Sequence, residues 1–239
     1  MNRPNSLKPH QSALFWACAL SIALWFVPFL RWATVPIQYF NTHIHEMFHA
    51  IVAVSTGGAV SHIEVHANGN GETYTAGGWG LFISSAGYLG ASLVGALLIA
   101  FAHSAKAAKV AAYALAVVLA YSMIVWVRMD LFGIVAGIVW IVALGAIGAK
   151  LPDDKRVFAL QFVGVQQCLN SLQSLLFLVH ISGFQAAQSD AKNVESMIGF
   201  PAILTALIWS ALSLAMMGLA LKVGWNSKPL NPTEPEWVR

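Results

Sequence analysis

Charged residues are scarce in this chain. Asp, Glu, Lys and Arg together make up 10% of its 239 residues, whereas they make up roughly a quarter of a soluble globular protein. So few charges cannot cover the surface of a water-soluble body of this size. Intrinsic disorder is excluded as well, because disordered chains are rich in charge and poor in apolar residues. The sequence is therefore neither that of a soluble domain nor that of a disordered chain.

Cysteine and an excess of one charge are lacking too. The two cysteines, Cys18 and Cys168, both lie in apolar runs, and neither has a second cysteine nearby. We expect buried thiols, and neither a disulfide nor a cysteine-based metal site. The net charge is only +3, and there is no basic patch with interleaved aromatic residues, which argues against a nucleic-acid partner.

Long hydrophobic runs, in contrast, fill the sequence. Hydrophobic residues make up 58% of it, and a helix needs about 20 apolar residues to cross a lipid bilayer. We therefore predict an all-α polytopic membrane protein with about six to seven transmembrane helices. The runs are 12–30, 33–55, 79–102, 108–127, 131–149, 157–181 and 200–223. They form one predicted integral-membrane domain, residues 12–223, between an N-terminal tail, residues 1–11, and a proline-rich polar tail, residues 224–239.

A different pattern separates the second run from the third. Residues 59–78 alternate between apolar and polar side chains and contain an Asn-Gly pair at 68–69, which is typical of the turn of a β-hairpin. We predict a short β-hairpin here. Side chains two residues apart on a strand share a face. For this reason His62, Glu64 and His66 form either a second metal site or a solvated face.

The second run contains His45-Glu46-Met47-Phe48-His49, which is an H-E-x-x-H motif. On a helix the two histidines, four residues apart, point the same way and can bind one metal ion, usually Zn²⁺. Glu46 can reach a metal-bound water and take its proton. Each ionisable group costs about 2.5–3.5 kcal/mol in a membrane helix, so three of them this close together are hard to explain as packing. We predict a zinc site at His45 and His49, with Glu46 as the general base.

The motif supplies two ligands, whereas a catalytic zinc site typically has three protein ligands and one open position. Glu46 and Asp130 are the acidic residues that lie in apolar sequence, and we predict Asp130 as the third ligand. The alternative is an ion pair of Asp130 with Arg128 at a loop. Straight helices that start at the same face would place Asp130 and His45 about 10 Å apart in depth, so a tilted or broken helix is required. His43 points away from His45 around the helix, and we expect it to make an accessory polar contact near the site.

These features together resemble the site-2 protease family of intramembrane zinc metallopeptidases, in particular its compact bacterial branch without a PDZ domain. The resemblance rests on the H-E-x-x-H helix, the hairpin, the glycine-rich segment 84–91 and an aspartate near the end of a later helix. It implies that His45, His49 and Asp130 bind one Zn²⁺ per chain and that Glu46 activates water.

The resemblance also bears on positions outside the motif. It implies a three-helix core within about residues 33–135, in which Gly87 of the glycine-rich segment has an accessory role. Ser189-Asp190-Ala191 is similar to a Ser-Asp-Ala element that precedes the last helix in compact relatives, which implies that Asp190 is a gate or an accessory polar group. The family's aspartate motif is Asn-Pro-Asp-Gly or Leu-Asp-Gly, and here Asp130 lies in Met-Asp-Leu-Phe-Gly instead.

The predicted function is intramembrane proteolysis. The protein would be a multi-pass protein of the bacterial inner membrane that hydrolyses a peptide bond in or near a transmembrane segment of a membrane-protein substrate. The hairpin would offer residues 63–65 as an edge strand to the unwound substrate, which makes Ile63 and Val65 candidate substrate-binding residues. Two alternatives stay open. One is a catalytically inactive metal-binding membrane protein, and the other is a metal transporter, which no inverted repeat supports.

Overall fold

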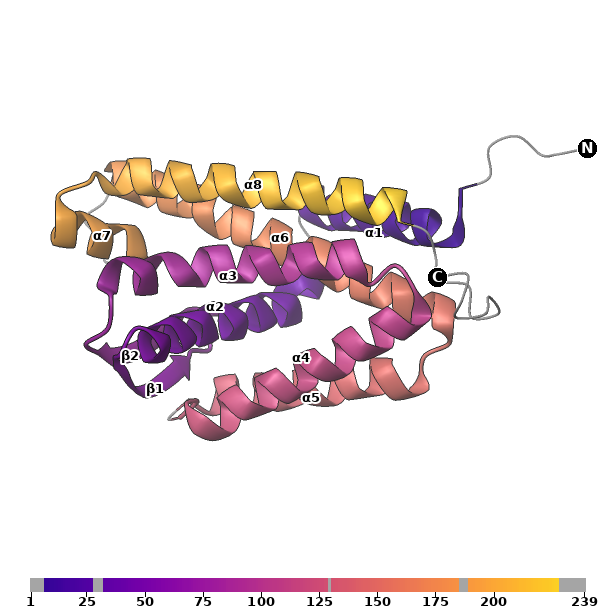
Figure 1. The fold of residues 1–239 in the computed structure, drawn as a ribbon, viewed down its shortest axis with the longest axis horizontal. Helices are drawn as coiled ribbons and strands as arrows, with labels where there is room; N and C mark the ends of the chain where they lie inside the picture. The colour runs from indigo at the N-terminus through magenta and orange to yellow at the C-terminus, as the bar shows by residue number, and fades with distance from the viewer. Residues whose placement is uncertain (1–6, 28–31, 129, 185–188, 228–239) are drawn as a thin grey trace, which may run out of the picture.

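A computed structural model describes residues 7–27, 32–128, 130–184 and 189–227 (Figure 1). Residues 1–6 and 228–239, which belong to the two predicted tails, lie outside the described residues. The described chain forms eight α-helices and one two-stranded sheet. These elements are α1 (Pro9–Phe26), α2 (Val35–Ser55), β1 (Ala59–Val65), β2 (Gly71–Ala76), α3 (Gly80–Phe101), α4 (Ala105–Val125), α5 (Leu131–Lys150), α6 (Asp153–Phe184), α7 (Asp190–Ile198) and α8 (Ala202–Asn226). The all-α class with a short hairpin between the second and third helices is confirmed.

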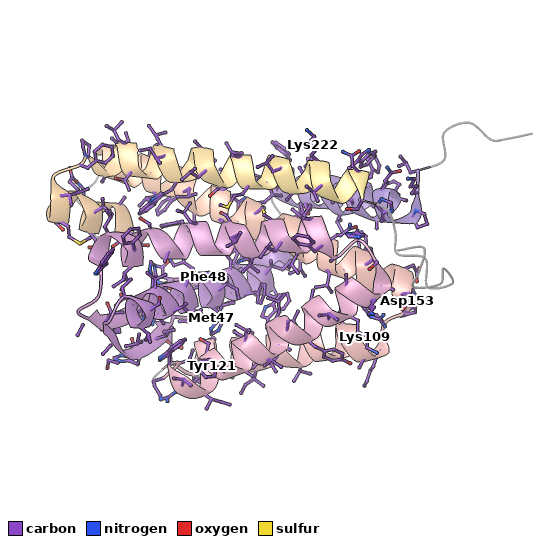
Figure 2. All side chains as sticks on the ribbon, in the orientation of Figure 1. Met47, Phe48, Lys109, Tyr121, Asp153 and Lys222 are labelled. Carbon is purple, nitrogen blue, oxygen red and sulfur yellow. The ribbon has the colours of Figure 1, made fainter. Side chains whose placement is uncertain are left out.

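Five of the described helices, α3, α4, α5, α6 and α8, are long and apolar enough to cross a membrane. The outer faces of α4 and α5 are apolar and exposed, as at Val117, Ile124 and Val142, which is the pattern of a lipid-facing surface. Lys109 near the start of α4 and Asp153 at the start of α6 lie at the same end of the bundle (Figure 2). Charged side chains at the ends of helices are expected where a bundle leaves the bilayer.

Helix α3 is at the centre of the bundle and packs against α2, α6 and α8 (Figure 1). Small residues let membrane helices approach closely, and Gly95 of α3 faces Gly164 of α6 in this way. A Cβ on Gly95 would lie 2.8 Å from the carbonyl oxygen of Gly164. On the other side of α3, Gly90 leaves room for the ring of Phe48 on α2. The glycine-rich part of α3 is thereby held against the helix that carries the H-E-x-x-H motif.

The hairpin is antiparallel, with Val65 opposite Gly71, and its turn contains Gly69 at a φ of 85°. A positive φ of this kind is accessible to glycine at little cost, which explains the Asn-Gly pair of the sequence. The hairpin lies beside α2 at the same end of the bundle as α7 (Figure 1).

The two strands of the hairpin have different surroundings. The backbone N–H of Ile63 donates to the carbonyl of Trp126 at 2.8 Å, and the N–H of Arg128 donates to the carbonyl of Ile63 at 3.0 Å. The side chains of Ile63 and Val65 are 0% exposed. At Ile63, strand β1 is therefore paired with residues 126–128 on one edge and with β2 on the other, which leaves no free edge for a substrate. Ile63 and Val65, the two predicted substrate-binding residues, belong to the core. The edge of β2 that faces away from β1 has no backbone partner among the described residues.

Candidate metal centre

Helix α2 presents the two motif histidines as the sequence predicts. Four residues on a helix return a side chain to the same face, and the Nε2 atoms of His45 and His49 lie 2.9 Å apart. His49 is 6% exposed. Its Nδ1–H donates to the backbone carbonyl of Ile83 on α3 at 2.5 Å. This bond fixes the ring and leaves the lone pair of Nε2 free for a ligand, as in histidines that bind metals.

The carboxylate beside the two histidines belongs to Asp190. Its Oδ2 lies 3.2 Å from Nε2 of His45 and 3.3 Å from Nε2 of His49. Asp190 is the first residue of α7, which Ser189 caps by accepting a hydrogen bond from the backbone N–H of Lys192. A helix N-terminus stabilises a negative charge, so this position favours an ionised carboxylate. Within the described residues, His45, His49 and Asp190 are the one group of three such side chains whose ligand atoms lie within 4.8 Å of one another.

Asp130, which the sequence predicts as the third ligand, makes other contacts in this structure. It caps α5, where its Oδ1 accepts from the backbone N–H groups of Phe132 at 2.8 Å and Gly133 at 3.4 Å. Its Oδ2 accepts from Nδ1 of His66 in the hairpin at 3.2 Å. Burial alone would raise the pKa of this carboxyl, but these hydrogen bonds outweigh it and hold the pKa below the ordinary 3.8. Asp130 therefore joins the hairpin to the start of α5 and does not reach the two histidines.

The three converging side chains suit a zinc ion. Two imidazole nitrogens and one carboxylate oxygen form a donor set that catalytic zinc sites use, with one position left open. Four ligands at about 2.0–2.1 Å around a tetrahedral ion lie about 3.3 Å from one another. The observed separations of 2.9, 3.2 and 3.3 Å are close to that value. The described side chains could therefore close around a single small cation with little movement.

Gly87 of α3 forms one wall of the centre. A Cβ at this position would meet Nε2 of His45 and would lie 2.5 Å from Nε2 of His49. The missing side chain thus leaves the space into which both nitrogens point. The next residue, Tyr88, packs edge-on against His45, with ring centroids 4.5 Å apart. The contribution of Gly87 is therefore steric, because the side chain of any larger residue would fill the space next to the Nε2 atoms of His45 and His49.

Glu46 lies beneath the second strand of the hairpin. Its side chain is 4% exposed, and the hydroxyl of Thr73 on β2 donates to its Oε2 at 2.8 Å. A Cβ on Gly71 would lie 2.6 Å from Cγ of Glu46. Strand β2 therefore covers the carboxylate and holds it by one hydrogen bond. The sequence predicts the hairpin, but its alternation gives no signal that Thr73 and Gly71 are the residues above Glu46.

The other histidines of this region have different roles. His43 is buried on the opposite side of α2, and its Nε2–H donates to the carbonyl of Gly133 on α5 at 2.9 Å. Its polar contact is therefore with the start of α5, and His43 does not belong to the group formed by His45, His49 and Asp190. In the hairpin, Nε2 of His62 lies 3.2 Å from Glu64, and Nε2 of His66 lies 3.8 Å from the other oxygen of Glu64. The ligand atoms of His62, Glu64 and His66 do not all lie within 4.8 Å of one another, whereas those of His45, His49 and Asp190 do.

Comparison with known proteins identifies a family for this chain. The profile of the family described as Peptidase M50B-like matches residues 14–220, which is most of the described chain. No curated protein and no solved structure matches significantly. The profile covers the motif helix, the hairpin, the glycine-rich helix and Asp190 together. The chain thus belongs to the Peptidase M50B-like family and is a membrane protein of the site-2 protease kind.

Proposed function

We propose that this protein is an intramembrane zinc endopeptidase in which His45, His49 and Asp190 hold the ion and Glu46 is the general base. The observation that carries the proposal is the convergence of these three ligand atoms from two segments that lie 145 residues apart. Packing alone does not explain two histidines and a carboxylate meeting inside an apolar bundle, because each of them is costly to bury without a purpose. A purely structural metal site would have no need of Glu46 beside it.

The chain's own residues would act as follows. Zn²⁺ bound at this centre would polarise a substrate carbonyl and lower the pKa of a water molecule. Glu46 follows His45 directly and would accept the proton of the attacking water and pass it to the leaving amine. The hydroxyl of Thr73 holds Oε2 of Glu46 at 2.8 Å and leaves Oε1 to take the proton. The hydrogen bond to Ile83 keeps His49 in the orientation and tautomer that binding requires.

The hairpin would present the substrate to this centre. A transmembrane helix hides its carbonyl groups in hydrogen bonds and must unwind before it can be cleaved. The open edge of β2 can pair with such an unwound segment by strand addition. Because Thr73 of β2 contacts Glu46, a segment paired with this edge would lie close to the general base. The substrate would accordingly be a membrane protein within the same bilayer.

Zinc content of the purified full-length protein in detergent tests the ligand set. We expect about one zinc per chain in the wild type and in Glu46→Gln, which would have lost only hydrolysis. Asp190→Asn and His49→Ala should lose the zinc, whereas Asp130→Asn should retain it. Asn has nearly the shape of Asp, and thermal unfolding would show that each variant is folded. Zinc retained in Asp190→Asn and lost in Asp130→Asn would overturn the assignment of Asp190 in favour of Asp130.

A further inference from the structure

Glu72 on β2 is an exposed carboxylate without a cation beside it. Side chains on a strand alternate between its two faces. Thr73 points inwards to Glu46, so its neighbours Glu72 and Tyr74 point outwards, where both are exposed. The hydroxyl of Tyr74 donates to Oε2 of Glu72 at 2.7 Å. Within the described chain, no Lys, Arg or His forms an ion pair with Glu72.

A second carboxylate lies directly across the hairpin from Glu72. This is Glu64 on β1, and like charges in opposite positions destabilise an antiparallel pair of strands. The sequence supplies no Lys or Arg between residues 32 and 105, which include α2, the hairpin and α3. Arg128 donates instead to backbone carbonyls at and just beyond the end of α4. The outer face of the hairpin therefore has a place for a Lys or Arg that these segments do not supply.

The free edge of β2 lies next to this place. The backbone of Ile63 is turned away from β2, because it pairs with residues 126–128. Thr73 is opposite Ile63, so its own N–H and C=O point away from β1, towards the free edge. A substrate segment that pairs antiparallel with this edge would place one residue opposite Thr73 and the next one opposite Glu72. That second pair would be of the non-hydrogen-bonded kind, in which the two side chains are closest.

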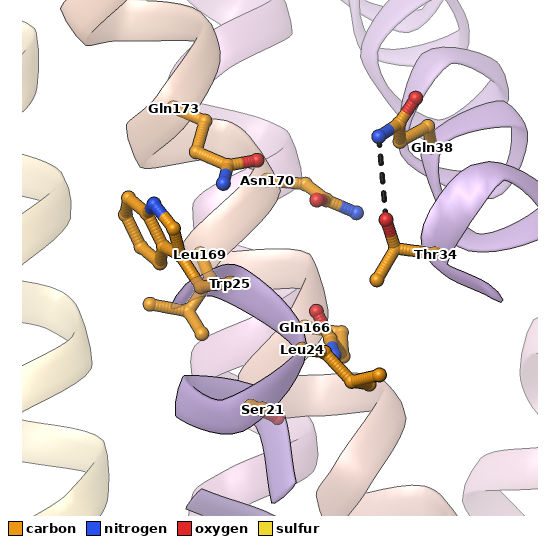
Figure 3. Close-up of a pocket in the computed structure, with 9 residues that line it drawn as sticks. All are labelled: Ser21, Leu24, Trp25, Thr34, Gln38, Gln166, Leu169, Asn170 and Gln173. Carbon is orange, nitrogen blue, oxygen red and sulfur yellow. Dashed lines mark hydrogen bonds between the residues drawn. The ribbon is translucent and has the colours of Figure 1, made fainter. Parts of the chain in front are cut away.

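Other places at this end of the bundle suit a substrate cation less well. Asp130, Asp190 and Glu195 each make an ion pair within the described chain. The pocket between α1, α2 and α6 is lined by uncharged residues (Figure 3), and it lies towards the start of α2, away from the hairpin. Glu72 is therefore the carboxylate that a basic residue on a segment paired with β2 would meet.

We propose that Glu72 selects substrates that carry Lys or Arg next to the residue paired with Thr73. Basic residues are common in the flanks of transmembrane helices and costly in their apolar middle. The favoured substrate would thus be a membrane protein that is cut in the unwound basic flank of a transmembrane helix. This proposal rests on the proposed function and names the substrate class of that site. The ion pair would form on binding and persist in the transition state, so it would lower KM and leave kcat unchanged.

Cleavage of model substrates by the full-length protein in liposomes tests the preference. The probes are single-span peptides of Leu, Ala and Gly in which one flanking position at a time carries Lys, Gln or Glu. At one position we expect a KM about tenfold lower for Lys than for Glu, because an attractive cross-strand pair replaces a repulsive one. Glu72→Gln should remove the preference, and Glu72→Lys should reverse it. The hairpin should tolerate the new lysine, since Glu64 lies opposite it.

Asp154→Lys is the matched control for the change of charge. Asp154 is also exposed, and it lies at the start of α6, at the other end of the bundle. This variant should keep the wild-type preference, and thermal unfolding would show that all variants are folded. A wild type that cleaves the Lys, Gln and Glu peptides with equal KM at every position would overturn the role of Glu72. A preference for Lys that persists in Glu72→Lys would overturn it as well. Both results would leave the proposed function intact.

Cross-linking tests the contact without any need for hydrolysis. A carbodiimide joins a carboxylate to a lysine amine that touches it, and mass spectrometry locates the bond. In Glu46→Gln, which should bind the peptide without cutting it, we expect the lysine peptide to be joined to Glu72. Peptide joined to other carboxylates, or to none, would refute the proposed contact. A wild type without zinc or activity would refute the proposed function, while the cross-link would still report on Glu72.

Discussion

Gly87→Ala is the substitution that most directly probes how α3 shapes the metal centre. The new Cβ would lie 2.5 Å from Nε2 of His49 and would also meet Nε2 of His45, whereas ordinary contacts begin at 3.4 Å. Restoring that distance requires the His49 ring, or α3, to move by roughly 1 Å. The His49 ring cannot turn freely, because its Nδ1–H donates a hydrogen bond to the backbone carbonyl of Ile83. The methyl group would therefore displace both nitrogens from the position that they now share.

The size of the effect follows from the tolerance of zinc sites. Zn–N distances are about 2.0–2.1 Å, and changes beyond about 0.2 Å are not compatible with a good site. Loss of a residue that orients a ligand typically costs about 10–100-fold in metal affinity. We expect Gly87→Ala to lose at least this much. Ala is preferred over Gly inside a helix by about 0.5–1 kcal/mol, so the helix propensity of α3 would improve while zinc binding is lost.

Competition with a chelator measures the zinc affinity, and thermal unfolding of the metal-free protein reports on the fold. Gly145→Ala in α5 is the matched control, because nothing lies within 4 Å of a Cβ at that position. It should bind zinc as tightly as the wild type. If Gly87→Ala also bound zinc with wild-type affinity, the steric argument and the assignment of this wall of the centre would both be refuted.

Three further predictions concern the hairpin and its attachment. Thr73→Val should lower kcat about tenfold at unchanged zinc content, because Glu46 loses the hydrogen bond that orients it, and Thr73→Ser should recover the rate. Gly71→Ala should abolish turnover of a model membrane substrate, since its Cβ would lie 2.6 Å from Cγ of Glu46, and zinc analysis would show the metal retained. Because His66 and the backbone lower the pKa of Asp130 from 3.8, the stability that this carboxylate adds is present at neutral pH and lost as the pH falls below that value. Hydrogen exchange of the hairpin should then quicken, and Asp130→Asn should remove the change.

The local parts of the centre could be predicted from the sequence. Periodicity alone places His45 and His49 on one face of α2, because four residues make about one helical turn. The hairpin follows from alternation and from the Asn-Gly pair, since a turn with positive φ needs a residue such as Gly69. The resemblance alone points to Gly87, and its steric role depends on where the two histidine rings lie in the folded protein.

The position of Asp190 beside the two histidines could not be predicted from a local pattern, and the resemblance implies Asp190 only as a gate or an accessory polar group. The apolar sequence around Asp130 suggests a buried ligand, yet that context arises because Asp130 caps α5 between two long apolar helices. Asp190 lies in a polar stretch, and α7 is a short helix that a hydropathy pattern does not distinguish from a loop. No pattern in the neighbouring residues predicts that Asp190 contacts His45, which lies 145 residues earlier in the chain. Two features of the sequence argue against Asp130 as a ligand. They are the mismatch in depth of about 10 Å between Asp130 and His45 and the departure of Met-Asp-Leu-Phe-Gly from the family's aspartate motif.

The two strands of the hairpin show a similar limit. Alternation identifies Ile63 and Val65 as side chains of one face, but it does not tell which strand remains unpaired. Residues 126–128 take the outer edge of β1 through the backbone of Ile63. That pairing involves a segment more than 60 residues away and leaves no trace in the local pattern. The open edge is consequently on β2, where Thr73 meets Glu46.

The distance along the chain between His45 and Asp190 has a consequence for biosynthesis. Ribosomes add about 5–20 residues per second, so the aspartate is made about 7–30 s after the histidine. During this interval α2 and then the hairpin are synthesised, while the carboxylate that meets the two imidazoles has not yet been made. A nascent or prematurely terminated chain therefore carries Glu46 without a complete centre. The order of synthesis therefore delays the meeting of His45, His49 and Asp190 until the start of α7 has been made.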